Sequence, residues 1–234
     1  MGTLMKRLMV CVAALLLVAP ASRAQEHNTL TRAEEEAGWR LLFDGTSMDG
    51  WRAYNRPALA GGWSARDGML TRTGRGGDII TEAQFADFEL KFDWMVGLAG
   101  NSGVLYRAVE GLEWVYHSAP EMQVLDDEGH RDGRSPLTSA GSNYGLHGAP
   151  RGVVHGANEW NSVRILVDGN HVEHWLNGTK VVEYELKSPE WKELVRNSKF
   201  VEWPAYGQAR RGHIALQDHG DTVWYRNFKI REIR

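Results

Sequence analysis

The stretch Phe88-Glu-Leu-Lys-Phe-Asp-Trp-Met-Val96 decides the fold class, because apolar and polar positions alternate along it almost without a break. In an extended strand, successive side chains point to opposite faces, whereas a helix would scatter the apolar ones around its circumference. The apolar residues would then share one face: Phe88, Leu90, Phe92, Trp94 and Val96. Glu89, Lys91 and Asp93 would take the other. The stretch therefore predicts a strand with one dry and one wet side.

Turn-forming pairs recur on both sides of this strand. Asp67-Gly68, Asp168-Gly169 and Asn177-Gly178 each stand between short runs of strand-like residues. Such pairs tolerate positive φ angles and are a strong local signal for hairpins. We therefore expect an antiparallel all-β domain, with the spacing of a sandwich or a jelly roll.

One short helix is expected near residues 188–197. Ser188 is suited to the N-cap, Pro189 to the first helical position, and Glu190 to the positive end of the helix. Residues 38–234 otherwise read as one continuous β-rich unit. The preceding residues 25–37 are polar and acidic, and they read as a lead-in or a helical turn.

Residues 1–24 have the pattern of a secretory signal peptide. Lys6 and Arg7 precede an apolar run, and Ser22-Arg23-Ala24 offers a cleavage site with small residues at its two ends. The apolar run is too short for a mature transmembrane anchor. We therefore expect an exported protein, periplasmic or extracellular, with no membrane anchor after the signal is removed.

The expected mature chain is acidic and lacks cysteine. Removing 24 of the 234 residues leaves 210, takes away the single cysteine, Cys11, and changes the formal net charge from −3 to −6. An acidic chain without a basic run is a poor partner for nucleic acid or for anionic membranes. A domain of this length can bury a sufficient core without disulfides.

Candidate site residues gather first in Pro120–Asp126. In a strand, Glu121 and Gln123 point to the same face, and Asp126 ends the run. A carboxylate and a carboxamide on one face are typical of the polar floor of a site; the alternative is an edge strand with a solvated face. Leu125 is the next residue in the alternation, so the segment does not support a glycosidase with two carboxylates.

A second polar concentration lies near the C-terminus. Gly212–Gln217 and Val223–Ile230 read as two strands, and Asp218-His219-Gly220-Asp221 between them reads as a tight turn. A rigid sheet often presents functional groups at the ends of its strands. The plainer interpretation is a turn whose Asp side chains cap backbone N–H groups.

Two other features could contribute to a site. The predicted loop 126–156 is long for a compact domain, and such loops are usually functional or mobile; it holds His130, Tyr144, His147 and His155. The chain also has 10 tryptophans, and aromatic faces can serve as platforms for sugar rings. We expect about two or three of them to face a ligand and the rest to be core.

Several site classes lack their sequence signatures. The chain has no G-x-S-x-G nucleophile motif, no phosphate-binding P-loop and no H-E-x-x-H zinc motif. His171 and His174 are three positions apart in a predicted strand, so they point to opposite faces and cannot ligate one metal together.

Taken in order, the motifs resemble those of the 3-keto-disaccharide hydrolase domain family. In the N-terminal half the resemblance rests on Leu41-Leu-Phe-Asp-Gly45, Gly62-Trp63 and Asp87-Phe-Glu-Leu90. In the C-terminal half it rests on Asn101-Ser-Gly103, Glu121–Asp126, Glu159-Trp-Asn161, His174–Gly178 and Gly212–Asn227. It covers roughly residues 38–234. It implies a concanavalin-A-like jelly roll of two antiparallel sheets.

The resemblance also implies action on 3-keto-glycosides. A ketone at C3 acidifies the C2 hydrogen, so a base can form an enolate and expel the C1 substituent, after which water adds back. Glu121 or His219 could be the base, and Arg107, Gln123 or one divalent cation could polarise the ketone.

The remaining candidate substrate-binding residues are Asp126, Tyr144, Gln217 and Asp218. The rival function is a non-catalytic carbohydrate-binding module of an exported bacterial protein, because the same jelly roll also occurs in lectins. The two functions differ in whether Glu121, Asp126 and His219 meet in one pocket.

Overall fold

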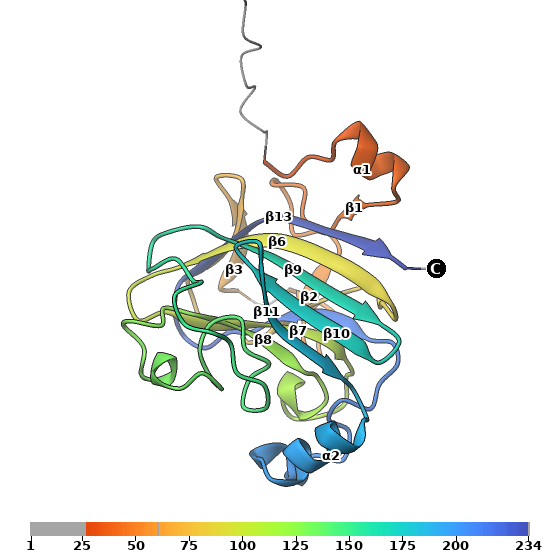
Figure 1. Cartoon of the computed structure of the whole chain (residues 1–234). Coiled ribbons are helices and arrows are strands. Elements are labelled where there is room, and N and C mark those ends of the chain that lie inside the picture. Colours follow the sequence, from red (N-terminus) through yellow and green to blue (C-terminus); the bar gives the residue numbers. More distant parts are fainter. Residues whose placement is uncertain (1–26, 60, 234) are drawn as a thin grey trace, which may run out of the picture.

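The computed structural model describes residues 27–59 and 61–233, and in it two antiparallel sheets pack face to face (Figure 1). The large sheet has the strand order β11-β10-β9-β6-β13-β4-β3, with β1 paired to β13. The small sheet has the order β2-β5-β12-β7-β8. The predicted all-β sandwich is confirmed. The predicted signal peptide, residues 1–24, lies outside the described residues.

The large sheet contains β1 (Arg40–Leu41), β3 (Trp63–Arg66), β4 (Met69–Arg72), β6 (Phe88–Val96), β9 (Asn161–Asp168), β10 (His171–Leu176), β11 (Thr179–Glu185) and β13 (Val223–Glu232). The small sheet contains β2 (Trp51–Ala53), β5 (Ile79–Thr81), β7 (Asn101–Ala108), β8 (Glu121–Leu125) and β12 (His213–Leu216). The helices are α1 (Arg32–Glu36), α2 (Pro189–Arg196) and the short 3-10 turns η1 (Val115–His117), η2 (Arg131–Arg134) and η3 (Lys199–Glu202). In the part of the chain that the structure describes, none of the helices has the length and apolar character needed to span a bilayer.

β6 forms where the alternation predicts it, with its apolar face buried in the core. Its other face is less wet than expected, because Glu89 is buried. Arg164 of β9 and Arg231 of β13 form ion pairs with Glu89 from the two neighbouring strands. The charged face of β6 is therefore covered by ion pairs rather than by water.

The main core fills the space between the two sheets. Phe92 of β6 stacks on Phe228 of β13 with ring centroids 4.8 Å apart. Across the sandwich, the hydroxyls of Ser102 and Tyr225 are hydrogen-bonded at 2.9 Å, which links the small sheet to the large one. Burying each large apolar side chain in such a core contributes about 1.5–3 kcal/mol.

The predicted turns and helix are present. Asp67 and Asn177 have φ values of 52° and 48°, as tight two-residue hairpins require, and each is followed by a glycine with positive φ. The Ser188 hydroxyl accepts a hydrogen bond from the Trp191 N–H at 3.0 Å and caps α2. These elements form where predicted because their signals are local.

The polar segment 218–222 connects two sheets rather than two paired strands. β12 belongs to the small sheet and β13 to the large one, so the chain crosses the sandwich between them. The segment therefore lies at one end of both sheets. This crossing brings Gln217 and His219 close to the strands that carry Asn101 and Glu121.

A second, smaller apolar cluster covers part of the outer face of the small sheet. Its strand residues include Ile80, Leu105 and Ala215, whose sequence neighbours on each strand belong to the main core. Val115 of η1 packs on this cluster from outside. Because side chains alternate along a strand, Glu121 and Gln123 of β8 share the outer face, while Met122 and Val124 enter the main core.

Candidate active site

A cavity of about 270 Å³ lies beside this outer cluster, between the small sheet and the loops that cover it. Five of its lining residues were predicted from the sequence: Glu121, Gln123, Tyr144, Gln217 and His219. Four others were not: Asn101, Tyr116, Asp132 and Lys199. Of the three residues whose meeting distinguishes an enzyme from a binding module, Glu121 and His219 line the cavity and Asp126 does not, and nothing in the geometry alone assigns their catalytic roles.

The Glu121 side chain is buried, and it fits because the residue beside it on the neighbouring strand is a glycine. A Cβ atom at Gly103, on the adjacent strand β7, would lie 2.0 Å from Glu121 Oε1. No donor among the described residues forms a hydrogen bond with the carboxylate. Burial raises the pKa of Glu121 to about 8, and Lys199 partly opposes this shift. Such a carboxyl can accept or donate a proton near neutral pH.

Two carboxamides beside Glu121 have oxygen atoms without a partner. Gln123 donates through Nε2 to the Thr138 carbonyl at 3.3 Å, but its Oε1 is buried with no donor among the described residues. The side-chain oxygen of Asn101 is likewise buried with no donor among the described residues. A buried acceptor left unpaired costs about 1–3 kcal/mol. Both oxygens are therefore suited to accept hydrogen bonds from the hydroxyl groups of a ligand.

Lys199 supplies the cation of the cavity. Although the residue as a whole is exposed, its ammonium lies 4.5 Å from the ring centroid of Tyr144 and 5.4 Å from that of Tyr116. None of the described carboxylates forms an ion pair with it. Burial of the ammonium lowers the pKa of Lys199, while Glu121 and Asp132 act in the opposite direction. The ammonium is available to a developing negative charge.

The loop after β8 closes the cavity and pairs with the edge of the sheet. Tyr144 N–H donates to the Glu121 carbonyl at 3.1 Å, and Gln123 exchanges backbone hydrogen bonds with Ser142 and Gly141. The Tyr144 hydroxyl donates to Asp132 Oδ2 at 3.3 Å. Burial, followed by the nearby carboxylates, raises the pKa of Tyr144 to about 12. β8 is thus an edge strand whose polar face is covered, not solvated.

His219 lies at the mouth of the cavity. It is exposed, and its Nδ1 is 3.4 Å from Asp221 Oδ2. The same carboxylate oxygen accepts a hydrogen bond from the Asn101 N–H at 3.2 Å. The ring of His130 meets that of His219 edge to face, with centroids 5.8 Å apart. Asp221 therefore orients an accessible imidazole next to the strand that forms the cavity floor.

The structure does not place Arg107 in the cavity. At this point two residues of β7, Tyr106 and Arg107, oppose one residue of β12, Ile214, and Arg107 has a φ of 54°. This bulge breaks the alternation of side chains along β7. The guanidinium is buried, forms an ion pair with Asp87 at 2.9 Å and donates to the Gly169 carbonyl at 2.8 Å. Arg107 fixes one end of the sandwich instead of binding substrate.

Asp126 and Asp218 are also outside the cavity lining. Asp126 is buried and accepts a hydrogen bond from the Ala99 N–H at 2.8 Å. Asp218 forms an ion pair with Arg72 at 2.6 Å and accepts hydrogen bonds from the backbone N–H groups of residues 76 and 77. The plainer interpretation of the turn, an aspartate that caps backbone groups, holds for Asp218.

The other loop histidines have structural contacts. His147 stacks on Tyr184 at 4.6 Å, and burial lowers its pKa. His155 Nδ1 is 2.8 Å from the Trp160 carbonyl oxygen. Neither residue lines the cavity. Of the residues that the sequence did not indicate, Asp132 could have been found in the long loop, but no local signal marks Lys199.

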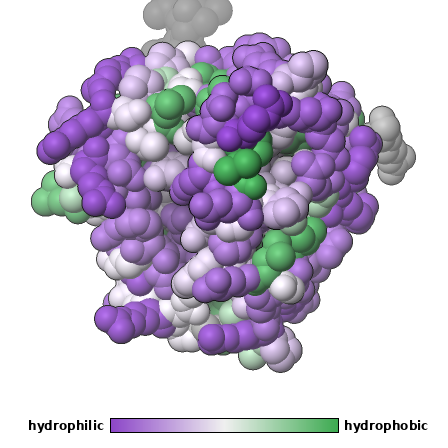
Figure 2. All heavy atoms as spheres, turned by 90° about the horizontal axis from the view of Figure 1, so that it is seen from below, coloured by the Kyte–Doolittle hydropathy of each residue, from purple (hydrophilic) through white to green (hydrophobic). Residues whose placement is uncertain are grey.

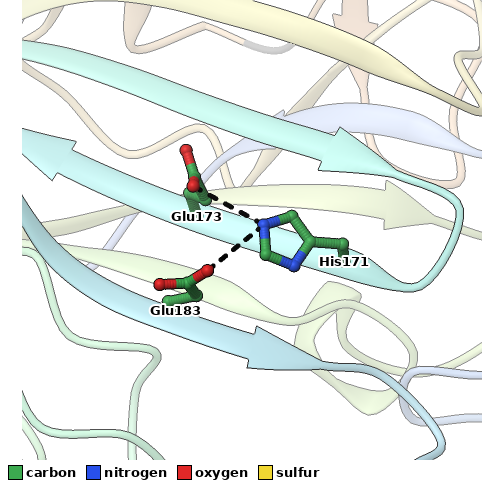
Figure 3. A group of neighbouring side chains, drawn as sticks. All are labelled: His171, Glu173 and Glu183. Carbon is green, nitrogen blue, oxygen red and sulfur yellow. Dashed lines mark ion pairs between the residues drawn. The ribbon is translucent and has the colours of Figure 1, made fainter.

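A possible metal-ligating group lies on the outer face of the large sheet (Figure 3). His171 Nε2 is 3.5 Å from Glu173 Oε1 and 3.6 Å from Glu183 Oε1. Lys180 forms ion pairs with both glutamates and already balances their charge. As predicted, His174 does not join His171, because it is buried on the opposite face of β10. The group is best described as an ion-pair cluster.

A larger cavity, of about 900 Å³, lies near α1 and is lined by residues that include Arg40, Glu89, Arg164 and Arg231. Each of these side chains already has an ion-pair partner. The smaller cavity combines a buried carboxyl, an unpaired ammonium and unpartnered amide oxygens, so it is the better candidate for chemistry.

The sequence is similar to that of a known protein family and of a relative within it. Residues 38–231 match the profile of the 3-keto-alpha-glucoside-1,2-lyase-like domain. A relative from Bacteroides thetaiotaomicron, named 3-keto-disaccharide hydrolase, is 33% identical over 241 aligned positions, which cover 89% of this chain and 83% of the relative.

Solved structures show the same fold. A candidate glycosyl hydrolase from Parabacteroides distasonis has 33% identity and a TM-score of 0.84, with coverage of 89% of this chain and 100% of that one. A carbohydrate-binding module, CBM66 from Bacillus subtilis, has 13% identity and a TM-score of 0.50, with coverage of 78% and 96%. The second likeness concerns the fold alone.

Proposed function

The chain belongs to the family of 3-keto-alpha-glucoside-1,2-lyase-like domains, and from this premise we propose that it cleaves glycosides whose sugar ring carries a ketone at C3. The observation that carries the proposal is Glu121, a buried carboxyl without a hydrogen-bond donor among the described residues, beside an unpaired ammonium. A proton transfer from carbon needs such a base together with a cation for the enolate.

The first half of the proposed reaction is an elimination. Glu121 takes the proton from C2, which the C3 ketone has acidified, and Lys199 stabilises the negative charge that develops on the ketone oxygen. The C1–O bond then breaks as a C1=C2 double bond forms. The leaving oxygen takes a proton from His219, which Asp221 orients at the mouth of the cavity.

The second half is the addition of water. The hydroxyl group of the water molecule bonds to C1, the other proton of that water returns to His219, and a proton passes from Glu121 to C2, so that the net reaction is hydrolysis to two free sugars. If the unsaturated sugar leaves before water adds, the same enzyme acts as a lyase. A divalent cation could take part in polarising the ketone, since Glu121, Asp132 and the amide oxygens are donors that hard cations accept.

A binding module is the second candidate, favoured by the fold that the chain shares with CBM66. Such a module needs a binding surface but no buried ionisable carboxyl. The perturbed carboxyl, the ammonium and the imidazole around one cavity favour catalysis. We also propose that the protein is exported, on the basis of the sequence pattern in residues 1–24.

The test uses 3-keto-trehalose and trehalose as parallel substrates in D₂O. We expect release of 3-keto-glucose from the oxidised sugar alone, with deuterium at C2 because that carbon loses its proton and regains one. A sample of 3-keto-glucose in D₂O without enzyme corrects for spontaneous exchange. Cleavage of trehalose at a comparable rate would exclude elimination and favour two-carboxylate hydrolysis, with Glu121 and Asp132 as the pair that the cavity offers.

A further inference from the structure

We propose that Trp114 and Tyr116 form a second sugar subsite at the mouth of the cavity, which holds the leaving group when that group is itself a pyranose ring. The inference rests on the proposed function, because it takes the cavity to hold the 3-keto ring. It adds a substrate preference, for 3-keto-disaccharides over 3-keto-glycosides with a small leaving group.

The size of the cavity places the leaving group outside it. Its volume of about 270 Å³ is below the range of about 300–1,000 Å³ for sites that enclose drug-sized ligands. One sugar ring fills a space of this size. A second ring attached at C1 must then lie against the surface around the opening.

Two stacked aromatic side chains connect the cavity wall with the protein surface, and we call them the platform. Tyr116 lines the cavity. The ring of Trp114 is nearly parallel to that of Tyr116, at an interplanar angle of 10° with centroids 6.3 Å apart. Trp114 is 49% exposed, so about half of its surface is accessible to a ligand. The platform therefore leads from inside the cavity to the surface.

The backbone that carries the platform is held in place. Val115, between the two rings, is fully buried in the outer cluster. The Ser118 hydroxyl donates to the Val115 carbonyl at 3.2 Å. The rings of Trp203 and Tyr116 meet edge to face, with their centroids 5.2 Å apart. An aromatic surface that is already ordered loses little conformational entropy when it binds a ligand.

The surroundings fit a neutral, hydroxylated ligand better than an apolar one. Lys199 lies 5.4 Å from the Tyr116 ring on the cavity side, and Glu113 is exposed beside Trp114. On the face seen from below in Figure 2, apolar residues form separate patches in a mainly hydrophilic surface. The two rings of the platform have the charged residues Lys199 and Glu113 beside them. A pyranose presents a matching combination of C–H face and hydroxyl rim.

The experiment compares two substrates with the whole protein. We expect W114A to lower kcat/KM for 3-keto-trehalose by roughly 3- to 10-fold, as an aromatic contact of this kind predicts, and to change kcat/KM for methyl 3-keto-glucoside less than about twofold. W114F should retain most of the activity on the disaccharide. Trp175, on the outer face of the large sheet, provides the matched control: W175A should not alter the ratio between the two substrates.

Equal losses on both substrates would overturn the subsite and assign Trp114 a structural role. No loss on either would overturn it as well. If the wild type cleaves neither substrate, the proposed function fails. Calorimetric binding of 3-keto-trehalose to wild type and W114A then still tests whether the platform binds a sugar ring. Weaker binding by W114A supports it, and equal or absent binding overturns it.

Discussion

Carboxylates on the outer faces of the two sheets have opposite surroundings and opposite pKa shifts. On the large sheet, Glu89 and Glu173 are surrounded by cations: burial acts to raise their pKa values, but hydrogen bonds outweigh it, and the pKa of Glu173 falls to about 2. On the small sheet, Glu121 is buried without a donor among the described residues, and its pKa rises to about 8. The carboxylates of the two sheets differ in their hydrogen-bond and ion-pair partners as well as in their burial.

This contrast separates a structural carboxylate from a candidate catalytic one. The glutamates of the large sheet are fixed in one charge state near neutral pH, so they hold strands together. Glu121 can change its charge state, at a cost to stability, because none of the described residues donates a hydrogen bond to its carboxylate. The cavity therefore shows the unsatisfied groups expected of a site that a ligand completes.

The strongest test of the contrast is removal of the carboxyl from each face. We expect E121Q to fold but to lose about two to four powers of ten in kcat on a 3-keto-glycoside, because the amide keeps the shape and cannot act as a base. E173Q, the matched change on the large sheet, should keep kcat within about twofold of wild type. Steady-state rates on 3-keto-trehalose measure both, and similar losses in the two variants would contradict the assignment.

Removal of the cation should have the next largest effect. K199M should lower kcat by about two to three powers of ten, the usual effect of losing a group that stabilises an oxyanion. Because Lys199 lowers the pKa of Glu121, its loss should also move the rising limb of the kcat/KM profile to higher pH. A pH profile that keeps its midpoint would show that the ammonium does not act on the carboxyl. K180M, in the ion-pair cluster of the large sheet, is the control.

The space for Glu121 can be tested through Gly103. A methyl group at this position would collide with the carboxylate, so G103A should displace the base and lower kcat/KM by about a hundredfold. G156A adds a methyl where no atom lies within 4 Å, and it should leave the rate unchanged. Thermal unfolding of both variants distinguishes displacement from loss of fold. An active G103A would mean that the carboxylate need not occupy this place.

The smallest effects concern stability, where the two faces should respond with opposite sign. Glu121 has a folded-state pKa above its ordinary value, so the native state binds more protons than the unfolded state between about pH 4.5 and 8, and wild-type stability falls as pH rises through this range. Glu173 has a lowered pKa, so its stabilising contribution is present above about pH 4.5 and is lost as pH falls towards 2.

At pH 8, therefore, E121Q should have a higher Tm than wild type, and E173Q a lower one. For E173Q we expect a loss of about 1 kcal/mol, or roughly 2–4 °C in a domain of this size. At pH 4.5 the gain in E121Q should disappear. Calorimetric scans at the two pH values measure these shifts in Tm. A shift of the same sign in both variants at pH 8 would contradict the difference between Glu121 and Glu173.

Local signals in the sequence were sufficient for the framework. The alternation in Phe88–Val96, the positive-φ pairs at the hairpins and the Ser188 cap all act within a few residues, so each could be predicted without knowledge of its neighbours. The segment of Glu121 and Gln123 was found in the same way. Arg107 was expected in the site, but it lies outside the cavity because a bulge, which depends on the partner strand, redirects its side chain.

The sequence by itself therefore determined an all-β sandwich, the family to which the chain belongs and Glu121 as a candidate site residue, because periodicity and ordered motifs are properties of the chain. Only the tertiary structure decided that Lys199, Asp132 and Tyr116 surround that carboxylate, and that Gly103 makes room for it. Residues far apart along the chain meet there through the packing of loops on the small sheet. Burial and proximity to charge, which set the pKa of Glu121, exist only after that packing is complete.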